Sequence, residues 1–184
     1  PTYALISGTF KNWRSMFDSK GRRIKRAIVI DMHSIKVCSE ELLDRFARVR
    51  LIAGLVNEKR AELETHNAEL DIDPDIKINS RRLTNVGLFR EYIKAYLKEN
   101  EYVIKDTSDK TFLVRQLPPG EHGLPIEIYV FLSDTDWVGY EEKMADIFDH
   151  LLSVVHEFEL SVFQVPTGAD FRSLLSENGE AGTN

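Results

Sequence analysis

The sequence predicts an α/β (α+β) domain in which helices pack on one face of an antiparallel β-sheet. The chain has 184 residues, of which 42% are hydrophobic, and this is enough to bury one core of its own. Apolar residues alternate at a period of two in some short stretches and recur at helical spacing in others. The resulting order is strand, helix, second helix, strand, strand, helix and strand.

The first predicted strand covers residues 22–32. Its period-two pattern places four apolar side chains on one side: Ile24, Ile28, Ile30 and Met32. This side is expected to face the core.

A first helix is predicted from Ser39 into the low sixties. The Ser39 hydroxyl can accept a hydrogen bond from a free backbone N–H, and Glu40 and Glu41 favour the positive end of the helix dipole. Apolar residues then recur at helical spacing, more sparsely towards the end, and Gly54 is a position where this helix could kink.

A second helix is predicted to start at Thr84-Asn85, after a loop over residues 71–80. Charged residues, including Lys94 and Lys98, fall on its solvent side. The apolar face comprises Leu88, Phe89, Tyr92, Ile93, Tyr96 and Leu97. We interpret this as an amphipathic docking helix, part of a helical insertion at about 51–98.

Residues 111–117 and 124–132 are predicted to form a β-hairpin around a loop rich in proline and glycine. A helix capped by Asp134 or Asp136 should follow. Its apolar positions are Trp137, Tyr140, Met144, Ile147, Phe148, Leu151, Leu152 and Val155. A last strand is expected over residues 159–165, stopped by Pro166.

With the inserted helix set aside, the order of elements is the split βαβ order of a ferredoxin-like sandwich. The domain is expected to cover residues 22–170. Residues 171–184 are predicted to be a disordered tail, because they carry too little apolar surface to order themselves.

Composition limits the partners and the compartment. A formal net charge of −6 disfavours nucleic acid as a main partner. The single cysteine, Cys38, excludes an intramolecular disulfide and suits a reducing compartment. No window approaches the ~18 apolar residues of a membrane span, and the chain opens at Pro1 without a methionine. We therefore expect a soluble fragment cut from a longer protein.

Residue types that often carry catalysis or bind metal are present, but none has the required spacing. The five histidines lie at positions 33, 66, 122, 150 and 156 and form no metal-ligand motif. Asp134-Thr135-Asp136 resembles the start of a calcium loop without its glycine and final glutamate. Cys38 precedes a helix start, but a buried structural thiol is the simpler interpretation. We expect no enzyme, no metal and no cofactor.

Basic residues gather at the start of the first strand: Arg22, Arg23, Lys25 and Arg26, after Lys20. Together with Arg81-Arg82, they could meet a membrane surface, nucleic acid or acidic groups of a neighbouring subunit. A purely solvated strand entrance is an equally good interpretation.

Several blocks of sequence resemble, in the same order, the cytoplasmic region of miniconductance mechanosensitive channels, which are members of the small-conductance (MscS-like) family. They are SRRLTNVGLFREY at 80–92, LVRQL at 113–117, GLPIEIY at 123–129, DIFDHL at 146–151 and FQVPTG at 163–168, with 1–7, 11–13 and 22–34 at the front. The resemblance covers nearly the whole chain except its tail.

The resemblance implies that residues 1–21 are the end of a small β domain with its linker, and that residues 22–170 are a cytoplasmic α/β domain. Such channels are homoheptamers in the bacterial inner membrane, and their cytoplasmic domains enclose a vestibule with side portals. They release ions and small solutes when hypo-osmotic shock stretches the membrane. Lys94 and Lys98 are then candidates for a portal lining. The transmembrane helices that hold the gate are not in this sequence.

Two alternatives remain open at this stage. The chain could be a ferredoxin-like regulatory domain that binds a small ligand without channel activity. It could also be a soluble scaffold or subunit with no channel.

Overall fold

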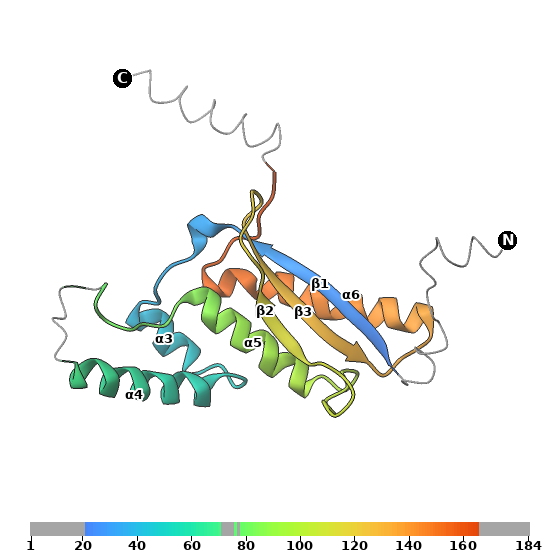
Figure 1. Ribbon diagram of the computed structural model, residues 1–184, viewed down its shortest axis with the longest axis horizontal. Coiled ribbons are helices and arrows are strands. Elements are labelled where there is room, and N and C mark those ends of the chain that lie inside the picture. Colours follow the sequence, from blue (N-terminus) through green and yellow to red (C-terminus); the bar gives the residue numbers. More distant parts are fainter. Residues whose placement is uncertain (1–20, 71–75, 77, 166–184) are drawn as a thin grey trace, which may run out of the picture.

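The computed structural model describes residues 21–70, 76 and 78–165 (Figure 1). The elements are β1 (Arg22–Ile30), α3 (Glu40–Phe46), α4 (Ala53–Glu69), α5 (Asn85–Glu99), β2 (Leu113–Gln116), β3 (Leu124–Leu132) and α6 (Trp137–Val154), with 3-10 turns η1 (Met32–Ser34) and η2 (Val155–Phe158). This confirms the predicted α+β class.

The three strands form an antiparallel sheet in the order β1-β3-β2. Ile28 lies opposite Ile126 in the first pair, and Val114 lies opposite Ile128 in the second. Because both outer strands are antiparallel to β3, they run in the same direction, with helices between them along the chain. This is the predicted split βαβ arrangement, but the helix that packs on the sheet between β1 and β2 is α5, which the sequence-based order had set aside as the insertion.

The predicted last strand over residues 159–165 is wrong in its length. It forms one isolated bridge, in which Val162 pairs antiparallel with Ile30. The N–H of Phe163 donates to the carbonyl oxygen of Val29 (2.8 Å). The segment therefore lies beside β1, as in a ferredoxin-like sheet. Before this bridge the chain leaves η2 through Glu159, which takes a left-handed φ of 54°. Pro166 lies outside the described residues.

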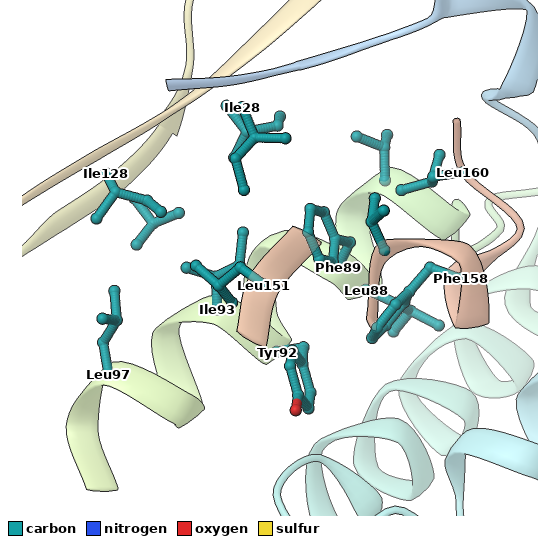
Figure 2. Packing of buried hydrophobic residues seen from close by; sticks show 14 of the residues in the cluster. Ile28, Leu88, Phe89, Tyr92, Ile93, Leu97, Ile128, Leu151, Phe158 and Leu160 are labelled. Carbon is teal, nitrogen blue, oxygen red and sulfur yellow. The ribbon is translucent and has the colours of Figure 1, made fainter. Parts of the chain in front are cut away.

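The core lies between one face of the sheet and the helices α5 and α6. Figure 2 shows Ile28 and Ile128 of the sheet above side chains of α5 and, from α6, Leu151. Ring contacts extend this core towards α3, because Phe158 stacks on Phe46 with centroids 4.4 Å apart. The buried residues form one continuous cluster.

The second predicted helix is confirmed as α5. The Thr84 side chain caps it by accepting a hydrogen bond from the N–H of Gly87 (3.2 Å). Five residues of its predicted apolar face are buried, and only Tyr96 is partly exposed. The predicted Asp136 cap of α6 is also confirmed, with the N–H of Gly139 as donor (3.1 Å).

The prediction of one continuous helix from Ser39 into the sixties is wrong, although the Ser39 cap is confirmed. The chain leaves the helix after Phe46 and starts α4 at Ala53, so the break precedes Gly54. Phe46 and Ile52 are both buried. In a continuous helix these two positions, six residues apart, would lie about 120° apart around the axis and would not share one face. The break between α3 and α4 allows both side chains to be buried.

The two helices inside the predicted insertion at 51–98 differ in their burial. Helix α5 packs beneath the sheet and buries most of one face. Helix α4 buries only Val56. Figure 1 shows α4 at the end of the molecule, beside α3. Sequence periodicity alone does not separate an integral helix from a peripheral one.

Three side chains predicted to lie on apolar faces are instead exposed. Met32 lies in η1 and is 48% exposed, because β1 ends two residues earlier. Trp137 and Leu152, near the two ends of α6, are also exposed. Among the described residues, no helix combines the length and apolar character needed to cross a membrane.

Candidate functional site

The basic residues predicted as an interface on β1 lie on two opposite faces of the sheet. Arg22 and Arg26 share the helix-covered side with the buried isoleucines. The guanidinium of Arg22 lies 4.3 Å from the ring centroid of Tyr140, and that of Arg26 lies 4.4 Å from that of Phe148. Both cations therefore cover aromatic rings of α6 at the margin of the core.

Arg23 and Lys25 lie on the other side of β1. Nη1 of Arg23 donates to the hydroxyl of Tyr129 on β3 (3.3 Å). Lys25 is exposed and lies opposite the same tyrosine in the strand register. The four residues therefore do not form one basic patch, and only this pair remains for a partner on the open sheet face.

An ion pair with a buried carboxylate and a half-exposed arginine lies further along this face. Glu127 is only 5% exposed, and its Oε2 accepts from Nε (2.9 Å) and Nη2 (2.8 Å) of Arg115. A buried carboxylate without such a partner would be costly, so the pair ties β2 to β3. Sequence reasoning missed this pair, because neither residue stands out until the register places them opposite each other.

Lys94 and Lys98 line one pocket with a volume of about 610 Å³. A third lysine, Lys105, lines it from the loop that follows α5, and Phe112 and Val114 supply apolar wall. No acidic residue lines this pocket within the described part of the chain. Sequence reasoning found the helical pair from its spacing but missed Lys105, whose loop has no periodicity to place it.

Two smaller pockets lie on either side of residues 81–83, against α4. Their volumes are about 430 and 450 Å³, and Arg81 and Arg82 line both. Arg60 in the first is held by Glu40 and Asp44, each at 2.7 Å. The arginine pair singled out in the sequence therefore lies between α4 and the start of α5.

The five histidines are dispersed. Within residues 21–70, 76 and 78–165, no three His, Cys, Asp or Glu side chains come together in a way that could hold a metal ion. His150 of α6 contacts α5, where its Nε2 lies 2.8 Å from the hydroxyl of Tyr92 and its ring stacks on Tyr96 at 4.3 Å. Burial lowers the pKa of His150, which favours its neutral form. This histidine joins two helices.

Cys38 is buried, as the simpler interpretation predicted. Burial raises the pKa of its thiol to about 11, and the nearby carboxylate of Glu159 contributes to the rise. The thiol therefore stays protonated at neutral pH and is a poor nucleophile there.

The carboxylates of the Asp134-Thr135-Asp136 sequence are used within the fold. Asp134 accepts from Nζ of Lys143 (2.6 Å) and from the N–H of Asp136 (2.9 Å). These hydrogen bonds lower the pKa of Asp134. Asp136 caps α6. Helix capping and the bond to Lys143 therefore account for the two aspartates that resemble the start of a calcium loop.

A scan of the sequence against models of known protein families found no match.

Proposed function

We propose that this chain is a cytoplasmic domain of a tension-gated ion channel, similar to the miniconductance branch of the small-conductance mechanosensitive family. In this proposal it forms part of the wall of a vestibule below the pore. The observation that carries the proposal is the ordered series of sequence blocks that resemble this family.

The positions of these blocks in the fold support the proposal. Those within the described residues fall on β1, the start of α5, β2, the start of β3, and α6, together with the segment beside β1. None falls on α3 or α4. The resemblance is thus concentrated on the α+β sandwich itself, as expected if the sandwich is the shared unit and the α3–α4 pair is an addition.

A vestibule wall requires surfaces for neighbouring subunits and for passing solutes. The open sheet face presents Arg23 and Lys25, and the pocket beside β2 presents three lysines. In the proposed homoheptamer, at the cytoplasmic face of the bacterial inner membrane, repetition of such cations would raise the local concentration of anions near a portal. Ions and small solutes would then be the species that pass through the portals.

A survival assay tests the proposed function. The full-length parent is expressed in bacteria that lack their own mechanosensitive channels, which are then shifted from high to low osmolarity. The proposal predicts improved survival over cells with an empty vector. Equal survival, with the protein shown to be in the membrane, would contradict it.

The portal assignment has a separate test. Lys94→Gln with Lys98→Gln should shift the ion preference of the open channel towards cations, because two positive charges per subunit are removed. Lys59→Gln with Lys36→Gln, on other surfaces, gives the same change in charge. An unchanged preference in the first pair would count against a portal lining.

The pockets against α4 favour a second candidate, a regulatory domain that binds a small anion. Arg82 lines both pockets, and its Nε donates to the hydroxyl of Ser80 (2.7 Å) rather than to a carboxylate. A melting temperature that rises with added ligand, and falls back in Arg82→Gln, would support this function.

A further inference from the structure

Strand β2 has an open outer edge. The N–H of Leu117 donates to the carbonyl oxygen of Pro125 on β3 (3.0 Å). In an antiparallel ladder, residues whose backbone groups bond to the partner strand alternate with residues whose backbone groups point outward. Leu117 is of the first kind, so the N–H and C=O groups of Val114 and Gln116 point away from β3. Within the described part of the chain these outward groups have no backbone partner. Such an edge can pair with another strand.

The lysine pocket lies directly along this edge. Helix α5 contacts β2, and Figure 1 shows the two running along the same diagonal of the molecule. Lys94 and Lys98 come from α5, whereas Phe112 and Val114 come from β2 and the residue before it. A strand added beside β2 would therefore place every second side chain towards these lysines.

The spacing of the lysines matches that of side chains on such a strand. Lys94 and Lys98 are four residues apart, which is about 6 Å along a helix axis. Residues i and i+2 of a strand are about 6.6 Å apart. Two acidic residues separated by one residue could then face one lysine each. Lys94 also pairs with Glu91 (2.8 Å), whereas Lys98 and Lys105 are exposed and form no ion pair among the described residues.

We propose that the edge of β2 is a docking site for an acidic, extended peptide segment, which pairs with the backbone of Val114 and Gln116 and places its carboxylates among Lys94, Lys98 and Lys105. This is strand addition, in which main-chain hydrogen bonds hold the segment and the side-chain pattern selects it. The inference is independent of channel activity, because it rests only on this edge and its charges.

A labelled peptide tests the site with the intact 184-residue chain. The probe is acetyl-Ser-Thr-Glu-Val-Glu-Val-Thr-Ser-amide, and its control has glutamine in place of both glutamates. Fluorescence anisotropy should show saturable binding of the acidic probe, weakened at high salt, and at least roughly fivefold weaker binding of the control. Equal affinity for both peptides would contradict the role of charge.

Two variants separate the backbone from the lysines. Gln116→Pro removes an outward N–H without breaking the ladder to β3 and should abolish binding. Lys98→Gln with Lys105→Gln should weaken binding roughly fivefold. Lys36→Gln with Arg48→Gln, on exposed positions away from this edge, is the control with the same change in charge and should bind as the unmodified chain does. Circular dichroism verifies that each variant is folded.

A membrane surface is the competing source of negative charge. Vesicles of phosphatidylcholine with one fifth phosphatidylglycerol are offered to the same proteins. Binding to vesicles that depends on Lys98 and Lys105 but survives Gln116→Pro, with no binding of the peptide, would overturn the proposal in favour of lipid. Peptide binding that Gln116→Pro leaves intact would also overturn it.

Discussion

Asn85 is a buried polar side chain that holds two segments of the chain together. It is fully buried, and its Oδ1 accepts from the N–H groups of Lys36 and Val86, both at 2.9 Å. Its Nδ2 donates to the carbonyl oxygen of Ser34 (2.8 Å). One amide thus joins the segment after β1 to the start of α5, which explains how a polar residue is tolerated in the core.

Asn85→Ala should lower the free energy of unfolding by about 2–3 kcal/mol, because it leaves buried backbone groups unsatisfied. Urea denaturation followed by circular dichroism measures this change. The exposed Asn57, on α4, provides the control, and Asn57→Ala should change stability by less than about 0.5 kcal/mol. Equal effects at both positions would refute the structural role of Asn85.

Cys38 predicts a specific pH dependence. The pKa of its thiol is about 11 in the folded chain, compared with an ordinary value of 9.0. The raised pKa means that the contribution of the thiol to stability is complete below pH ~9 and is lost as the pH rises towards 11. Between pH ~8 and ~10.5, the free energy of unfolding should fall by about 2 kcal/mol more in the unmodified chain than in Cys38→Ala. Urea denaturation at each pH measures this difference. An equal loss of stability in the unmodified chain and in Cys38→Ala would contradict the burial of the thiol.

At the scale of elements, the β2–β3 hairpin depends on one glycine. Gly123 has a φ of 115°, and a Cβ at this position would lie 2.3 Å from the carbonyl oxygen of Ile30. Gly123→Ala should therefore cost at least about 2 kcal/mol of stability. Gly120, across the same turn, has open space around it, so Gly120→Ala is the matched control. Similar melting temperatures of the two variants would contradict the hairpin geometry.

The start of each helix could be predicted from sequence where a local signal exists. Ser39, Thr84 and Asp136 each cap a helix through a hydrogen bond that involves residues only three positions apart. The break before α4 has no such local signal: Phe46 and Ile52 on either side of it are both buried, and Phe46 stacks on the distant Phe158.

The same distinction applies to the candidate site. Helical periodicity is a local signal, and it is enough to place Lys94 and Lys98 on one face of α5. The third lysine, Lys105, and the pairing of Arg115 with Glu127 depend on loop conformation and strand register, which no local pattern specifies.

The two faces of the sheet differ in their surroundings across the whole molecule. One face builds the core with α5 and α6, and the basic side chains on it are occupied by aromatic rings. The opposite face carries Arg23 and Lys25, and the β2 edge lies beside three lysines, of which Lys98 and Lys105 form no ion pair among the described residues. Contacts of the proposed vestibule wall with subunits, solutes or peptides are therefore expected on these two surfaces.

The proposed channel function is tested most directly by a patch-clamp recording of the full-length parent in bacterial membranes stripped of other mechanosensitive channels, with suction applied to the patch. A tension-gated channel should give small, reproducible openings whose probability rises with tension. Silence up to the point of membrane rupture, with the protein shown to be inserted, would contradict the proposed function.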